Sequence, residues 1–233
     1  MKFKNIISLK GEFEAEGLSR DTVAAESAFA ARNGVGYLVK IGGCEAKSDM
    51  LYLRQIGIRS IVAPMVESPF AMRKYQDMLP EGAFDHVGVT IETVDAVARI
   101  EEILDAGTKL TEVTVGRTDL TASYGGNNVD GERTIEMVKK VARAAQARGL
   151  KTTMGGSVNK NTRALLAEDE ELRELIVCIE TRKCVMPVDK FATNGALQDA
   201  FEVEGVLLDM IVAHHGTVAK AAESRVGQIR SRL

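Results

Sequence analysis

Short apolar runs alternate with amphipathic stretches along almost the whole chain, and this alternation constrains the fold more than any other feature. Each run is mostly apolar or β-branched, as is typical of strands buried on both faces of a parallel sheet. The runs that we expect to form strands are Ile6–Leu9, Gly36–Ile41, Ser60–Ala63, His86–Ile91, Glu112–Val115, Lys151–Met154 and Leu175–Ile179, with a further candidate at Lys183–Met186.

The stretches between these runs carry helix signals. Asp21 is placed to cap a helix over Thr22–Arg32, and Asn33-Gly34 is placed to end it. Further helices are expected over Ser48–Ile56, Ser68–Leu79, Thr93–Ala106, Asp130–Arg148 and Asn161–Leu175, and from about Ala196 to Arg232 we expect one or two helices broken near Gly216. Strands that alternate with helices in this way predict a parallel sheet.

Two architectures fit a parallel sheet of this length: a closed (β/α)8 TIM barrel and an open doubly wound sheet. No glycine-rich dinucleotide or phosphate-loop fingerprint follows the first strand, which favours the barrel. We therefore expect one α/β domain over residues 1–233. The helical segment from about residue 196 to 233 exceeds what a barrel needs, and its apolar residues predict a subunit interface in a homo-oligomer.

Composition excludes several classes of partner. Hydrophobic residues make up 45% and charged residues 27% of the 233 residues, and the net charge is −3, so the chain lacks the basic surface that nucleic acid or an anionic membrane requires. No apolar run is long enough to span a bilayer. The three cysteines show no metal-binding spacing, and their odd number favours a reducing compartment. We expect a cytoplasmic protein.

Charged residues follow most of the predicted strands. In a parallel barrel these strand ends meet at one mouth, where active sites are built. Glu92 and Asp119 follow two consecutive strands, so their carboxylates are expected a few ångströms apart. Such a pair suits a hard divalent cation, Mg²⁺ or Mn²⁺, whose remaining ligands are water and substrate oxygens. Each of these residues taken alone is equally well explained as a solvated loop residue. The prediction of a cation site therefore depends on Glu92 and Asp119 occurring together.

Two segments resemble a known family. Val87–Gly125 contains an apolar strand that ends in Glu-Thr, a helix, and a second apolar strand that ends in Gly-Arg-Thr-Asp-Leu, followed by Ser-Tyr-Gly. Gly57–Ala71 contains a strand that ends in Pro-Met-Val. These motifs resemble the HpcH/HpaI aldolase and citrate lyase β-subunit family over about Ile6 to Gly156. The resemblance implies a barrel of the phosphoenolpyruvate/pyruvate type that makes or breaks carbon–carbon bonds.

The resemblance also implies roles for individual residues. Glu92 and Asp119 would be the metal carboxylates, and Lys40 falls where many of these aldolases carry an arginine that touches the oxoacid carbonyl. The substrate carboxylate would meet the backbone N–H groups of Gly116, Arg117, Thr118 and Asp119.

The chain departs from the family at the acid–base position. The family carries a histidine after an Asp-x-Glu at an early strand end, whereas this chain reads Lys10-Gly11-Glu12-Phe13-Glu14. We expect Glu14 or Glu12 to replace the histidine. Lysine at position 40 also lacks the bidentate fork of arginine. From the resemblance we also expect the chain to start one strand late relative to the family, with the family's first strand missing or replaced.

These observations predict a metal-dependent carbon–carbon lyase, an aldolase that acts next to a small 2-oxoacid through an enolate. One alternative is a thioester lyase of the citryl-CoA or malyl-CoA kind, although no basic stretch that would accept adenine is evident. A different class is a non-catalytic barrel that binds an oxoacid, an alternative that the missing histidine favours.

Overall fold

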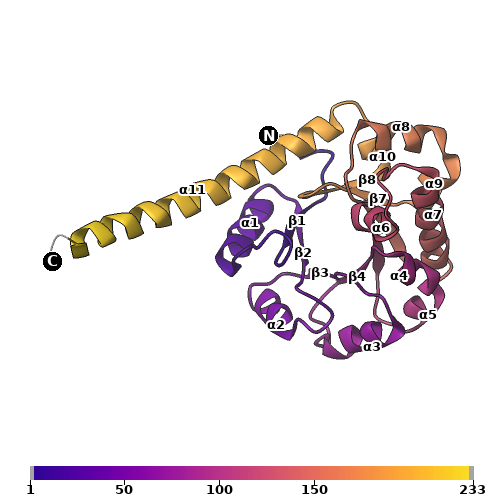
Figure 1. The fold of residues 1–233 in the computed structure, drawn as a ribbon, viewed down its shortest axis with the longest axis horizontal. Coiled ribbons are helices and arrows are strands. Elements are labelled where there is room, and N and C mark those ends of the chain that lie inside the picture. The colour runs from indigo at the N-terminus through magenta and orange to yellow at the C-terminus, as the bar shows by residue number, and fades with distance from the viewer. Residues whose placement is uncertain (1–2, 231–233) are drawn as a thin grey trace.

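The computed structural model describes residues 3–230, and within this range eight strands close into one barrel in chain order (Figure 1). The closed barrel confirms the predicted fold class. The strands are β1 (Ser8–Glu12), β2 (Gly36–Lys40), β3 (Ser60–Ala63), β4 (His86–Ile91), β5 (Glu112–Gly116), β6 (Lys151–Gly155), β7 (Cys178–Glu180) and β8 (Cys184–Pro187).

The eighth strand runs against the others. Strands β1 to β7 are parallel, each paired with the next, but β8 is antiparallel to both β7 and β1. It follows β7 through a tight turn, in which the Thr181 backbone N–H donates to the Cys184 carbonyl at 2.9 Å. Val185 then pairs with Glu180 on one side and with Ser8 on the other. The barrel is thus completed beside β1 by a reversed strand from the C-terminal part of the chain.

Helices wrap the outside of the barrel (Figure 1). They are α1 (Arg20–Arg32), α2 (Lys47–Gln55), α3 (Pro69–Met78), α4 (Val94–Ala98), α5 (Ile100–Asp105), α6 (Arg117–Ser123), α7 (Glu132–Gln146), α8 (Lys160–Glu168), α9 (Glu170–Leu175), α10 (Val188–Phe191) and α11 (Ala196–Arg230). Their number is larger than predicted because the expected helices over 93–106 and 161–175 are each divided in two and because the short helices α6 and α10 were not expected.

Local capping explains where these helices begin. Ser19, and not Asp21, caps α1: its hydroxyl accepts the Thr22 N–H at 3.1 Å, and Asp21 lies in the first turn. Asp169 divides the second of the split helices because its backbone is extended and its carboxylate accepts the Leu172 N–H at 2.9 Å. A side chain that satisfies a free N–H starts a new helix where sequence periodicity alone predicts continuation.

The apolar core lies mainly between the strands and the helices, and the barrel interior holds little of it. A large buried cluster fills the layer outside the strands. Inside the barrel, buried Leu38, Val62 and Val185 form a small separate cluster with half-buried Cys178 packed against it. The rest of the interior toward the mouth is lined by polar side chains. The barrel therefore carries a polar cavity above a thin apolar layer.

Helix α11 continues through Gly216, so the predicted break there is wrong. Glycine within a helix costs about 1 kcal/mol relative to alanine but does not by itself end one. The first turns pack on the barrel through Ala196, Ala200, Val203 and Leu207. From Val212 onward the helix is exposed and projects away from the barrel (Figure 1).

The sequence also predicts where the C-terminal helix ends and that the chain has no membrane-spanning helix. Arg232, where the predicted helical tail ends, lies outside the described residues. No helix within residues 3–230, α11 included, combines the length and the apolar character that crossing a membrane requires.

A buried ionic cluster anchors the turn between β7 and β8. The Lys183 ammonium is fully buried and lies 2.5 Å from a Glu16 carboxylate oxygen and 3.0 Å from one of Glu26 in α1. Tyr37 of β2 donates its hydroxyl to the other Glu26 oxygen at 2.6 Å. Gly11 makes room for this contact, because a Cβ at that position would lie 2.1 Å from the Tyr37 hydroxyl. The cluster joins β1, β2, α1 and the turn.

We expect Lys183→Met to lower the free energy of unfolding by about 3 kcal/mol, because it leaves two buried carboxylates without their cation. Chemical unfolding followed by circular dichroism measures the change. Lys190→Met is the control, since Lys190 is half exposed and its nearest carboxylate oxygen is 3.9 Å away. Equal unfolding curves for the two variants would contradict the anchoring role.

Candidate active site

A cavity of about 470 Å³ opens at the carboxyl ends of the parallel strands. This volume lies in the range of small-molecule binding sites. The lining comes from β1 to β7, from the loops that follow them and from the start of α11. Its charged members are Lys10, Glu12, Lys40, Glu92, Asp119, Glu180, Arg182 and Glu204.

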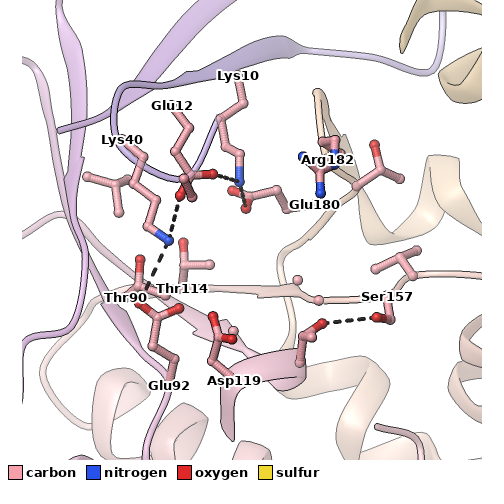
Figure 2. A pocket seen from close by; sticks show the side chains of 18 of the residues that line it. Lys10, Glu12, Lys40, Thr90, Glu92, Thr114, Asp119, Ser157, Glu180 and Arg182 are labelled. Atoms are coloured by element: carbon pink, nitrogen blue, oxygen red, sulfur yellow. Dashed lines mark hydrogen bonds and ion pairs between the residues drawn. The ribbon is translucent and has the colours of Figure 1, made fainter. Parts of the chain in front are cut away.

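Five of these charges alternate in sign across the cavity floor (Figure 2). The Lys40 ammonium lies 3.7 Å from a Glu92 carboxylate oxygen and 2.9 Å from one of Glu12. The Lys10 ammonium lies 3.9 Å from the other Glu12 oxygen and donates a hydrogen bond of 2.7 Å to Glu180. The chain of charges therefore runs from β4 through β2 and β1 to β7. Alternation of sign offsets the cost of burying so many charges in one place.

Burial and neighbouring charges shift two pKa values in this chain of charges. Burial raises the pKa of Glu92, and nearby Asp119 adds to the rise, although Lys40 and the Met65 N–H act against it. For Lys10, burial lowers the pKa, but the carboxylates of Glu180 and Glu12 outweigh burial and hold the pKa above the ordinary lysine value. Lys10 is therefore an ammonium ion at neutral pH.

Two residues with strained backbone lie at the mouth. Within the described residues, Met65 and Ser157 are the non-glycine residues with a left-handed φ, each at +50°. Met65 directs its N–H to Glu92 at 3.1 Å, and the Ser157 hydroxyl contacts the Thr118 hydroxyl at 3.0 Å. A left-handed conformation costs about 1–2 kcal/mol for such residues, and strain of this kind concentrates at functional sites.

Glu92 and Asp119 fit a divalent cation. Their carboxylates lie side by side in Figure 2, and Gly116 permits this, because a Cβ there would come within 2.6 Å of a Glu92 oxygen. The lining holds five carboxylates and three cationic side chains, so two negative charges are in excess. Nowhere in residues 3–230 do three His, Cys, Asp or Glu side chains form a complete metal-binding group. Two carboxylates with water and substrate oxygens are the donor set that Mg²⁺ commonly accepts.

A glycine leaves open the space in front of two backbone N–H groups beside the carboxylates. Gly156 has φ +85°, and a Cβ on it would lie 2.5 Å from the Thr118 nitrogen and 2.7 Å from the Arg117 nitrogen. These nitrogens begin α6 directly after β5. Backbone N–H groups at such a turn can hold an anionic oxygen.

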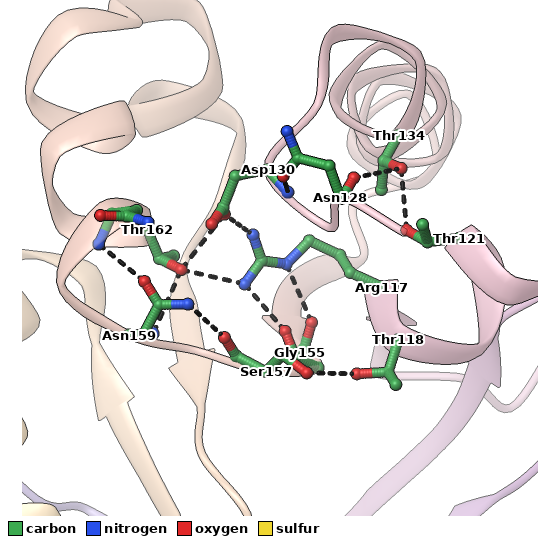
Figure 3. Close-up of polar contacts among 12 residues, drawn as sticks. Arg117, Thr118, Thr121, Asn128, Asp130, Thr134, Gly155, Ser157, Asn159 and Thr162 are labelled. Atoms are coloured by element: carbon green, nitrogen blue, oxygen red, sulfur yellow. Dashed lines mark hydrogen bonds and ion pairs between the residues drawn. The ribbon is translucent and has the colours of Figure 1, made fainter. Parts of the chain in front are cut away.

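The side chain of Arg117 points away from this space and fastens two loops together (Figure 3). Its guanidinium is fully buried and donates to the carbonyls of Gly155 at 3.0 Å and Gly156 at 2.9 Å, as well as to Asp130 and Thr162. Arg117 is not among the lining residues. The side chain therefore positions the β6 loop over the start of α6, and only the Arg117 backbone faces the space beside Gly156.

The structure brings most of the predicted site residues into one cavity. The lining includes Lys40, Glu12, Glu92, Gly116, Thr118 and Asp119. Glu14 is exposed, lies beside Gly42 and is outside the lining. Phe13, which the family resemblance places near the position of the histidine, is buried in the outer core with its ring 6.4 Å from that of Tyr52.

Sequence reasoning missed Lys10 and Glu180. Lys10 precedes Glu12 by two residues, so the period of two in a strand places both side chains on the same face. That signal was available in the sequence. Glu180 lies 170 residues from Lys10 and had no local signal that connects them.

Comparisons with solved structures support the fold. An HpcH/HpaI aldolase from Desulfitobacterium hafniense DCB-2 is 19% identical with a TM-score of 0.62, and the alignment covers 85% of this chain and 82% of that one. An HpcH/HpaI aldolase/citrate lyase family protein from Burkholderia cenocepacia J2315 is 17% identical with a TM-score of 0.61, covering 84% and 85%. RipC from Yersinia pestis is 15% identical with a TM-score of 0.57, covering 84% and 96%.

Sequence comparison then gives the family. A search of curated protein sequences gives no significant match. The sequence pattern of the HpcH/HpaI aldolase/citrate lyase family, in contrast, matches residues 42–170, more than half of the chain. This range contains both strand ends that carry Glu92 and Asp119. The chain therefore belongs to the HpcH/HpaI aldolase/citrate lyase family.

Proposed function

We propose that this protein is a divalent-metal-dependent carbon–carbon lyase that acts on a small 2-oxoacid through an enolate. The observation that carries the proposal is the Glu92–Asp119 pair, in a cavity with two negative charges in excess and with the Lys40 ammonium beside Glu92. Membership of an aldolase/citrate lyase family supports lyase chemistry.

Each group has a role in this chemistry. Glu92 and Asp119 would hold Mg²⁺ or Mn²⁺, which when bound supplies Lewis acidity to the keto group of the substrate. Lys40, 3.7 Å from Glu92, would place its positive charge where negative charge develops on the enolate oxygen. The open space beside Gly156 would receive the substrate carboxylate at the N–H groups of Arg117 and Thr118.

Cavity size favours a small substrate over a thioester. About 470 Å³ accommodates an oxoacid with a small carbonyl partner, whereas most of a coenzyme A thioester would lie outside the cavity. The aldolase proposal is therefore better supported than the thioester lyase. The non-catalytic alternative depends on the missing histidine.

The first test is the exchange of the C3 protons of pyruvate with D₂O, followed by NMR with and without Mg²⁺ or Mn²⁺. We expect exchange that depends on the metal. Glu92→Gln should weaken Mn²⁺ binding, measured independently by electron paramagnetic resonance, and reduce exchange by a factor of about 100 or more, because one of two metal carboxylates is lost.

Glu67→Gln is the matched control, since Glu67 follows the neighbouring strand β3 but is exposed and bonded to Thr93 outside the cavity. Undiminished metal binding and exchange in Glu92→Gln would exclude the proposed metal site. Metal and pyruvate binding without exchange in the unaltered protein would favour the non-catalytic barrel.

The second test concerns the carboxylate. We expect Gly156→Ala to raise the KM for pyruvate at least tenfold, because the new methyl group fills the space in front of the Arg117 and Thr118 N–H groups. Gly57→Ala is the control: its φ of +80° imposes similar backbone strain, but nothing lies near its added Cβ. If both variants lower stability alike and neither changes KM, the carboxylate binds elsewhere.

We also propose that the protein is a homo-oligomer in which the projecting part of α11 packs on another copy. In proteins most of the stability of a helix comes from packing of an apolar face, and the projecting part of α11 is exposed. Apolar or small residues recur on it at alternating spacings of four and three, the pattern of a helix–helix seam, except that His215 occupies one position of the pattern. They are Leu208, Val212, Ala219, Ala222, Val226 and Ile229, and all of them are exposed.

Sedimentation velocity tests this proposal. We expect the unaltered protein to sediment as an oligomer, and Val212→Glu combined with Val226→Glu to shift it toward the monomer, because two charges would enter the seam. Ser224→Glu adds a charge on another face of the same helix and should leave the oligomer intact. A monomeric unaltered protein would contradict the proposal.

A further inference from the structure

We propose that Lys10 is the acid–base residue of this site and that Glu180 is the positioning residue that holds it. The inference deepens the proposed function and rests on it, since it names the group that exchanges a proton with the substrate. Neither residue was assigned a role by the family motifs.

The cavity offers few groups that can carry a proton. Among the lining residues of the described chain there is no histidine, cysteine or tyrosine. Arginine does not lose its proton in proteins, which excludes Arg182. Glu92 and Asp119 are assigned to the cation. The remaining candidates are the two lysines, the carboxylates of Glu12 and Glu180 that contact them, and Glu204, whose carboxylate accepts the Lys183 N–H at 3.0 Å.

Contacts distinguish the two lysines. Lys40 lies between Glu12 and Glu92, beside the assigned metal position. Lys10 makes one hydrogen bond, of 2.7 Å, to Glu180, whereas its distance of 3.9 Å to Glu12 is too long for another. An ammonium group has three N–H donors, so Lys10 retains donors for a substrate oxygen or carbon.

A second observation concerns a polar group on the cavity floor. Thr114 lines the cavity, is 3% exposed, and its hydroxyl has no hydrogen-bond partner among the described residues. Buried hydroxyl groups are almost always hydrogen-bonded. Thr114 of β5 and Lys10 of β1 both face the interior, so a ligand that reaches Thr114 lies within the barrel where the Lys10 donors are.

Lys10 would give its proton either to C3 of the enolate or to the oxygen of a carbonyl partner. When the enolate returns to the ketone, its π electron pair forms a new C3–H bond, an N–H bond of Lys10 breaks, and the electron pair of that bond stays on nitrogen as a neutral amine. With a carbonyl partner, the same pair forms the C3–C4 bond, the partner's C=O π electrons move to its oxygen, and that alkoxide takes the Lys10 proton. Cleavage runs these steps in reverse.

The resting protonation state suits this role. The carboxylates of Glu180, Glu12 and Glu16 outweigh burial and raise the pKa of Lys10, so the proton is in place before the enolate forms. An ammonium ion is not a nucleophile, which disfavours imine formation with the substrate.

The experiment separates enolate formation from proton transfer. Decarboxylation of oxaloacetate generates the pyruvate enolate by loss of CO₂, without removal of a proton from C3. Exchange of pyruvate C3 protons requires an acid–base residue in both directions. We expect Lys10→Met and Lys10→Arg to retain decarboxylation within a few-fold and to reduce exchange by about 10²–10⁴-fold. Lys10→Arg keeps the charge but cannot give up its proton, so restored exchange in that variant would overturn the proposal.

Lys139→Met is the matched control. Its ammonium is as buried as that of Lys10, with side-chain exposures of 10% and 11%, and lies 2.7 Å from Asp169 outside the barrel. Both activities should survive in it. Loss of both activities in Lys10→Met would assign Lys10 to binding or structure and overturn the inference. Absence of both activities in the unaltered protein would instead overturn the proposed function.

Two further readouts do not depend on comparing rates between variants that fold differently. Added methylamine or ethylamine should restore exchange to Lys10→Ala, with a rate that follows the pKa of the amine. A rate that is independent of added amine would contradict the proposal. Borohydride reduction in the presence of pyruvate should leave the mass of the protein unchanged, and a pyruvate adduct on Lys10 would overturn acid–base catalysis in favour of an imine.

The role of Glu180 is read from the pH profile of exchange. Lys10 faces Glu180 on β7, Glu12 on its own strand and Glu16 in the following loop, and Lys40 on β2 faces Glu12. Glu180→Gln removes the strongest of the charges that raise the pKa of Lys10. In the pH profile, the exchange rate rises with pH as Lys10 loses its proton. In Glu180→Gln this rise should therefore occur at lower pH. A purely structural role for Glu180 would leave that rise in place.

Discussion

The turn that reverses the chain between β7 and β8 determines how this barrel closes. Seven parallel strands leave one edge of β1 and one of β7 unpaired, and β8 fills both only because the turn sends it back antiparallel. The Lys183 carbonyl in that turn accepts the Lys10 N–H at 2.9 Å, and the Lys183 ammonium is held by Glu16 and Glu26. The turn thus joins β1 to β7 and brings Glu180 within reach of Lys10.

The closed barrel has a charged interior, and each charge in it is stabilised by a neighbour of opposite sign. Each buried ion would be costly alone, but in the chain from Glu92 to Glu180 every ion has a neighbour of opposite sign. The excess negative charge therefore concentrates at the Glu92–Asp119 end, where a cation is most stabilising. Arg117 completes the arrangement from the outer side by holding the Gly155-Gly156 loop over α6. The same loop leaves the space that an anionic group would occupy.

The parts of the site that sequence predicts are those encoded locally. Strand alternation placed Glu92 and Asp119 at consecutive strand ends, and the family motifs gave them a role, because both signals lie within a few residues of each side chain. The orientation of β8 had no such signal: a short apolar run looks the same in either direction, and the reversal depends on Lys183 finding carboxylates 157 and 167 residues away. The Lys10–Glu180 contact is nonlocal for the same reason. At Gly216 a local signal was present but gave a wrong prediction. A glycine ends a helix only if the residues around it do not favour continuing the helix.

The proposed use of Lys10 in the role of the family histidine changes more than the identity of one side chain. Phe13 directs its ring into the outer core against Tyr52, so the backbone at this position does not present a side chain to the cavity. Lys10, three residues earlier, faces the cavity and carries an ammonium whose carboxylate partners keep it protonated. An imidazole with a pKa near neutrality accepts and donates protons with similar ease, whereas this ammonium is poised to donate. In bond formation the alkoxide needs a proton at once, and in bond cleavage the catalyst must first be a free base. In the proposed role, the charges around Lys10 therefore put its proton in place for bond formation, whereas cleavage begins from the minor, unprotonated form of the same residue.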